Sequence, residues 1–121
     1  KETELVFEFD INDIEKFAKE NKMELPKSKK YKNKKGEKPL FKLRKSAIAI
    51  HPITNELYVL SAIEHILYIF DFQGNIKHII MLNKDLFNKA EGITFLDNAD
   101  MLISNEGVNK KPTILRFNYK K

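Results

Sequence analysis

Two glutamates and one serine have the side chains and positions that best suit ligand binding in this chain. Ser46 and Glu91 each stand at the start of an apolar run typical of a strand, and Glu106 lies in a Glu-Gly turn after a later run. Calcium takes about six to eight oxygen ligands, carboxylates among them. Glu91 and Glu106 are therefore predicted as two ligands of a partial calcium site, with Ser46 on the same rim. The plainer alternative is that Glu91 caps backbone amides or pairs with a basic neighbour.

The histidines add one residue to this rim. His51, His65 and His78 lack the spacing of a metal motif such as HExxH. His65 belongs to the connection that leaves a predicted strand, so it is the histidine expected to reach the rim. His51 is expected in a turn and His78 on an outer strand.

Motifs of other chemistries are missing from the sequence. Residues 97–100, Asp-Asn-Ala-Asp, lack the glycine and the distal glutamate of an EF-hand, so they are predicted as an ordinary turn. The chain has no GxSxG elbow, no P-loop and no GxGxxG motif. The residues thus give no support to nucleophilic or nucleotide chemistry.

Apolar runs with a period of two predict the strands that position these residues. Four runs form one antiparallel meander and three form a second, incomplete one: 46–50, 56–61, 66–72 and 76–82, then 91–96, 101–105 and 113–119. A further run at 5–10 is expected to be the third strand of a preceding unit. Residues 11–21 have the apolar spacing of a short helix, with Asn12 or Asp13 as its N-cap.

The strands recur at a nearly constant spacing. The aligned pairs are Ser46 with Glu91 (45 residues apart), Leu57 with Met101 (44) and Leu67 with Ile114 (47). A four-stranded repeat of about 45 residues is the period of a β-propeller blade. We therefore expect an all-β fold: a β-propeller fragment of about two to two and a half four-stranded antiparallel blades, with a short helix and a lysine-rich insertion. A β-sandwich is the alternative, but it explains the recurrence less naturally.

The predicted inner strands suit a crowded propeller axis, where small side chains are needed on one face. Small residues alternate with large ones in both runs: Ala47 and Ala49 with Ile48 and Ile50, then Gly92 and Thr94 with Ile93 and Phe95.

The chain is expected to divide into four segments: 1–15 as an outer strand of a preceding blade, 16–45 as the helix and lysine-rich insertion, 46–90 as a complete blade and 91–121 as a partial C-terminal blade. A closed propeller needs at least about four blades. Either the remaining blades belong to the same protein, which is the simpler expectation, or copies of the chain associate. The abrupt, polar start at Lys1 is expected to be a mature or trimmed end.

The net charge of +5 is concentrated in one segment. Residues 16–45 hold thirteen Lys or Arg against three acids, a local charge of +10, which leaves −5 for the rest. Residues 26–39 of this segment are predicted as a solvated loop, because lysine solvates a surface as readily as it binds phosphate. The segment's cations are lysines apart from Arg44, and it lacks the regular interleaving of aromatics and arginines typical of nucleic-acid surfaces, so no nucleic-acid partner is expected. The chain has no cysteine for disulfides or thiolate metal sites, and no apolar run of a length that predicts a transmembrane segment.

A series of motifs stands in order between residues 41 and 117: Ser-Ala-Ile-Ala-Ile-His-Pro at 46–52, Leu-Tyr-Val-Leu-Ser at 57–61, Asp71 with Gly74, Glu-Gly-Ile-Thr-Phe at 91–95 and Ile-Ser-Asn-Glu-Gly at 103–107. With these motifs, residues 41–117 resemble the C-terminal part of the SdiA-regulated family of bacterial propeller proteins. Lys45 departs from it, since a proline is usual before the serine. The resemblance implies a propeller similar to calcium-dependent phytase-like and gluconolactonase-like proteins, and a periplasmic or cell-surface location.

These observations favour a propeller that binds a ligand or a protein partner, with Ca²⁺ at its central channel. The alternative is a calcium-dependent hydrolase of the phytase-like or lactonase-like type, in which Glu91 and carboxylates from other blades hold the ion. The substrate or ligand is not specified by these residues.

Overall fold

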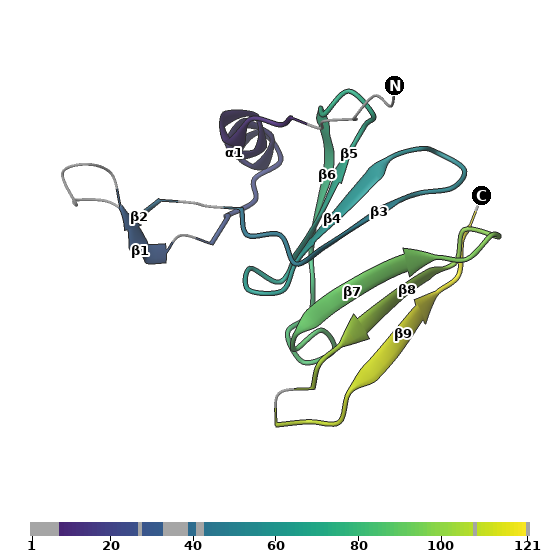
Figure 1. Cartoon of the computed structure of the whole chain (residues 1–121). Helices are drawn as coiled ribbons and strands as arrows, with labels where there is room; N and C mark the ends of the chain where they lie inside the picture. Colours follow the sequence, from purple (N-terminus) through teal and green to yellow (C-terminus); the bar gives the residue numbers. More distant parts are fainter. Residues whose placement is uncertain (1–7, 27, 33–38, 41–42, 108, 121) are drawn as a thin grey trace, which may run out of the picture.

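The computed structural model describes residues 8–26, 28–32, 39–40, 43–107 and 109–120 of the chain (Figure 1). These residues form one helix and three antiparallel sheets of two, four and three strands. The elements are α1 (Ile11–Glu20), β1 (Ser28–Lys32), β2 (Pro39–Leu40), β3 (Ala47–Ile50), β4 (Leu57–Ser61), β5 (Ile66–Phe70), β6 (Ile76–Met81), β7 (Ala90–Phe95), β8 (Met101–Asn105) and β9 (Thr113–Phe117). The fold is mostly β, as the alternating apolar runs predict.

The four-stranded sheet is a meander in which each strand pairs with the next, in the order β3-β4-β5-β6. Tight turns maintain its register. In the β5–β6 turn, the Asp71 carboxylate accepts hydrogen bonds from the backbone N–H groups of Gln73 and Asn75, both at 2.9 Å. Gly74 in this turn has a φ of +91°, and a Cβ atom there would lie 2.2 Å from the carbonyl oxygen of Glu8. This position therefore requires glycine.

One face of this sheet packs against α1. The helix begins after Asp10, whose carboxylate accepts a hydrogen bond from the Asn12 N–H at 2.8 Å. Ile14 and Ala18, four residues apart, lie on the same helix face and are buried against the sheet. Burial of an isoleucine side chain stabilises a fold by about 1.5–3 kcal/mol. The buried cluster consists of Ile14, Ala18, Leu57, Val59, Ile66, Tyr68, Phe70 and Ile79.

The other face of the four-stranded sheet packs against the three-stranded sheet β7-β8-β9. Strands β3 and β7, the first of each sheet, lie next to each other at this interface (Figure 1). The side chains buried between the sheets are Leu60, Leu67 and Ile69 from one sheet, and Phe87, Ala90 and Ile103 from the other side. The described residues thus form an open pair of sheets that does not close into a ring.

The predicted strands of both meanders are confirmed, with ends that differ by one or two residues. Two predictions about residues 8–13 are wrong. The helix is capped by Asp10 and not by Asn12 or Asp13, because the Asp10 backbone is extended (φ −99°, ψ 126°) and its side chain reaches the first turn. Residues 8–10 of the predicted 5–10 strand are not in a strand, since Phe9 turns inward to stack on Phe70 at a ring distance of 4.6 Å. Residues 1–7 lie outside the described residues.

The lysine-rich segment also differs from the loop that its composition predicts. Strand β1 pairs with β2 in an antiparallel arrangement, with a shift of register between Ser28 and Lys32. Two short strands therefore form within this segment, because backbone pairing does not require apolar side chains.

Candidate functional site

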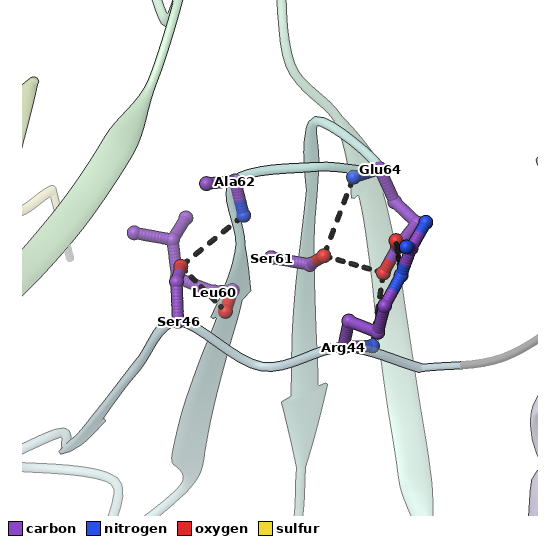
Figure 2. A network of polar contacts seen from close by, with 6 residues as sticks. All are labelled: Arg44, Ser46, Leu60, Ser61, Ala62 and Glu64. Carbon is purple, nitrogen blue, oxygen red and sulfur yellow. Dashed lines mark hydrogen bonds and ion pairs between the residues drawn. The ribbon is translucent and has the colours of Figure 1, made fainter.

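Ser46 connects the two large sheets at the start of their first strands. Its Oγ accepts a hydrogen bond from the Ala62 N–H at 3.1 Å (Figure 2). Its hydroxyl proton is shared between the carbonyl oxygens of Leu60 at 3.1 Å and Ala90 at 3.0 Å. Leu60 belongs to β4, and Ala90 is the first residue of β7. The predicted rim serine therefore acts as a tie between sheets, and its hydroxyl has hydrogen-bond partners on both.

Glu106 pairs with Lys89, and the charge of Glu91 also acts on this lysine. The Lys89 Nζ forms an ion pair with Glu106 Oε2 at 2.8 Å, and the Glu106 N–H donates to the Lys89 carbonyl at 2.9 Å. The hydrogen bond and the charge of Glu106 raise the pKa of Lys89, and the charge of Glu91 adds to this effect. Glu91 itself is exposed at the start of β7. Lys89 forms its ion pair with Glu106, so the alternative that Glu91 caps backbone amides or pairs with a basic neighbour stays a prediction.

The structure brings Ser46 and Glu91 together, because Ser46 bonds to the residue that precedes Glu91. Glu106 joins them through Lys89. His65 lies in the β4–β5 turn, and its carbonyl accepts a hydrogen bond from the Leu82 N–H at 2.9 Å. None of the contacts described for this part of the chain joins His65 to the other three residues.

A calcium ion at Glu91 and Glu106 would need more oxygen ligands than these side chains supply. Within the described residues, no three histidine or carboxylate side chains are grouped closely enough to hold a metal ion. The Lys89 ammonium also pairs with Glu106, where a bound cation would have to lie. An ion bound here would therefore displace Lys89 and recruit ligands from outside the described residues.

A buried carboxylate network beside Ser46 was not predicted from the sequence. The Glu64 side chain is only 3% exposed and accepts hydrogen bonds from Arg44 Nε and from the Arg44 backbone N–H, both at 3.0 Å (Figure 2). The hydroxyl of the fully buried Ser61 also donates to Glu64, at 2.5 Å. This network fixes the segment just before Ser46 against the β4–β5 turn. The sequence signal that could have predicted this network is the connection Ser-Ala-Ile-Glu at 61–64, in which a glutamate follows small or apolar residues. A glutamate is buried only when its charge is paired, so a buried partner would have been expected.

Tyr68 lies in the core on the same sheet. Burial raises the pKa of its phenol, and the negative charge of Glu64 raises it further. The phenol is therefore protonated at neutral pH and packs in the core as a neutral side chain.

The opposite end of the sheet pair contains a second buried polar group, His51. Its Nδ1 accepts hydrogen bonds from the backbone N–H groups of Ile53 and Thr54, each at 3.2 Å. Its ring lies 4.9 Å from that of Phe95 and 5.2 Å from that of Tyr119, both on the other side of the interface. The expected turn is confirmed, but its contact with the second sheet was not foreseen.

The C-terminal tail is held at this end by Asp100. The Asp100 carboxylate pairs with Arg116 at 2.7 Å and accepts the Tyr119 N–H at 2.9 Å. These contacts lower the pKa of Asp100, the Tyr119 N–H being the largest cause. Residues 97–100 form the predicted turn, in which Ala99 has a φ of +73° and donates its N–H to the Leu96 carbonyl.

No family model and no curated protein matches this chain. The resemblance to the SdiA-regulated family therefore stays a prediction. Among the described residues, no helix has the length and apolar character needed to cross a membrane.

Proposed function

We propose that this chain supplies two adjacent blades of a β-propeller and binds a ligand or protein partner at the end of the sheets where Ser46 and Glu91 lie. The proposal is supported above all by the Ser46–Ala90 hydrogen bond, which ties the starts of β3 and β7 side by side. In a propeller, the first strands of successive blades surround the axis. The exposed Glu91 carboxylate is then the side chain that faces an incoming ligand.

Calcium is the proposed ion of this end, with Glu91 and Glu106 as two of its ligands. Lys89 competes with it, because its ammonium already neutralises Glu106. Removal of Lys89 should therefore strengthen calcium binding, whereas removal of either glutamate should weaken it. The resemblance to the SdiA-regulated family carries with it a periplasmic or cell-surface location.

Calorimetric titration with CaCl₂ and thermal melting test the calcium part of the proposal. We expect a Ca²⁺-dependent rise in melting temperature for the wild type, a larger rise for Lys89→Met and none for Glu91→Gln. Lys84→Met, which removes another exposed lysine with no ion pair to Glu106, is the matched control. Absence of a calcium response in both the wild type and Lys89→Met would refute this part.

A test of the proposed propeller architecture requires the native, full-length protein. An intact mass and an experimental structure should show a ring of blades with β3 and β7 at its axis. A native protein that ends as an isolated pair of sheets would contradict it. Turnover of a phosphoester or lactone that depends on Glu91 would instead favour the hydrolase.

A further inference from the structure

An aromatic pocket opens between the two large sheets at the end opposite to Ser46. Figure 1 shows the β3–β4 turn and the β7–β8 turn at this same end. The pocket has a volume of about 290 Å³. Its lining comes from both sheets and from the tail after β9, and it includes His51, Tyr58, Phe95, Tyr119 and Lys120. Because it lies between the sheets and not on their outer faces, neighbouring blades of a propeller would leave it open.

Four rings in contact with one another form the aromatic wall of this pocket. The His51 ring lies 4.9 Å from that of Phe95 and 5.2 Å from that of Tyr119. The Tyr58 ring meets that of Phe95 edge-on, at 4.9 Å and an interplanar angle of 87°. Such ring pairs are mutually stabilising, so the wall is formed before any ligand arrives. A cavity of about 150 Å³ holds one benzene ring. The pocket therefore has room for a single aromatic ring with a short substituent.

The polar side chains of the wall present hydrogen-bond donors. Nδ1 of His51 accepts two backbone N–H groups, so the ring proton lies on Nε2. Burial raises the pKa of Tyr58, and the charges of Glu56 and Tyr119 raise it further, so its hydroxyl keeps its proton at neutral pH. Within the part of the chain that the structure describes, no hydrogen bond involves Nε2 of His51 or the hydroxyls of Tyr58 and Tyr119. These three donors are available to a ligand.

The charge at the edge of the pocket is positive. Lys120 is exposed, and it forms no ion pair among the described residues. Its position is fixed from the preceding residue, because the Tyr119 N–H donates to the Asp100 carboxylate at 2.9 Å. Glu56 acts on Tyr58 from outside the described lining of the pocket. A ligand that enters the pocket therefore meets one free cation and several donors.

We propose that this pocket binds a single-ring aromatic carboxylate. The ring packs against the aromatic wall, and the carboxylate accepts hydrogen bonds from the donors of the wall and faces Lys120. A few polar groups that fix the orientation of a largely apolar ligand are typical of small-molecule sites. This binding is independent of any ligand at Glu91, because the two sites lie at opposite ends of the sheet pair.

Titration with sodium benzoate, followed by NMR of the aromatic side chains, tests this proposal. We expect the resonances of the four wall rings to shift with a common dissociation constant, while the ring of Tyr68, buried against α1, does not respond. Cyclohexanecarboxylate lacks the aromatic ring and should bind about tenfold more weakly. Benzylamine has the ring with a positive charge and should not bind. Equal affinity for benzoate and benzylamine would overturn the proposal.

Four variants separate the charge of the ligand from its ring. Tyr58→Phe keeps the ring, loses the hydroxyl and should weaken benzoate binding about tenfold. Lys120→Met should weaken it about threefold, and Glu56→Gln should strengthen it because a negative charge beside the pocket is removed. Lys84→Met, which changes an exposed lysine outside the pocket, is the matched control and should bind like the wild type.

Melting curves establish that each variant is folded before its affinity is measured. The proposal fails if the wall rings of the wild type do not respond at the highest soluble concentration of benzoate. It fails as well if folded Tyr58→Phe and Lys120→Met both bind benzoate as tightly as the Lys84→Met control.

Discussion

The hydroxyl oxygen of Ser46 lies 3.0 Å from the carbonyl oxygen of Ala90, the first residue of β7. The same oxygen accepts the Ala62 N–H, so one side chain holds the turn after β4 and the start of the second sheet. A backbone N–H or C=O that is shielded from water and loses its hydrogen-bond partner raises the free energy of the folded state. Ser46 provides such partners to Ala62 and Ala90, so it stabilises the fold and also helps to place the second sheet against the first.

Ser46→Ala should lower the free energy of unfolding by about 1–2 kcal/mol, because the Ala62 N–H loses its acceptor and the Ala90 carbonyl its donor. Urea denaturation measures this as a lower midpoint with an unchanged slope. Ser104→Ala, a half-buried serine in β8, is the matched control. Equal midpoints for Ser46→Ala and the control would contradict the role of the tie.

Glu64→Ala should destabilise the fold by about 3 kcal/mol, because it leaves the Ser61 hydroxyl and the Arg44 amide without their acceptor. Glu64→Gln should cost less, since one amide oxygen still accepts. Chemical denaturation of both variants gives the order. If Glu64→Gln proved as damaging as Glu64→Ala, the charge rather than the hydrogen bonds would dominate.

Asp100→Asn should make the free energy of unfolding depend less on pH in the acidic range. The pKa of Asp100 is lowered in the folded state, first by the Tyr119 N–H and then by Arg116. The unfolded chain therefore binds more protons at acidic pH, and the stabilisation is present above the ordinary aspartate pKa of about 3.9. It is lost as the pH falls through the lower folded value.

Denaturation of the wild type and Asp100→Asn at pH values from neutral to acidic measures this difference. The wild type should be the more stable of the two at neutral pH, and the gap should shrink towards acid. Arg116→Met, which removes one of the two main causes, should lie between them. Parallel stability curves for the wild type and Asp100→Asn would be incompatible with this account.

His51→Ala should destabilise the contact between the sheets by about 2–3 kcal/mol. The backbone N–H groups of Ile53 and Thr54 lose their acceptor, and Phe95 loses a ring neighbour. Thermal and urea unfolding measure the loss. His78→Ala, on an exposed position of β6, should stay within about 0.5 kcal/mol of the wild type. Similar losses for both histidines would show that the sheet contact of His51 is unimportant.

Much of the strand layout followed from the sequence. The alternation at 46–50 and 56–61 and the turn residues between these runs predict β3 and β4, because a half-buried strand has a period of two. The start of α1 was misplaced, since Asn12 and Asp13 are good cap residues by type and only the backbone conformation selects Asp10.

The proximity of two candidate residues followed from the sequence, whereas their role in ligand binding stays a prediction. Ser46 and Glu91 were placed together by the repeat, and the structure joins them through Ala90. The role of Lys89 was missed, because a lysine beside an acidic residue in the sequence does not reveal which carboxylate it meets in space. The link from Arg44 to Glu64 spans 20 residues and has no local sequence signature.

By itself, the sequence determined the strands, their order and their recurrence about every 45 residues, because side-chain period and turn chemistry act over short distances. The tertiary structure alone decided which face of each strand is covered, and by what. Ile48 and Ile93 are aligned at an offset of 45 residues in the predicted repeat, yet Ile48 is 48% exposed and Ile93 packs between the sheets. The physical reason is that burial depends on a neighbouring sheet, and the pattern of one strand carries no information about whether that neighbour is present.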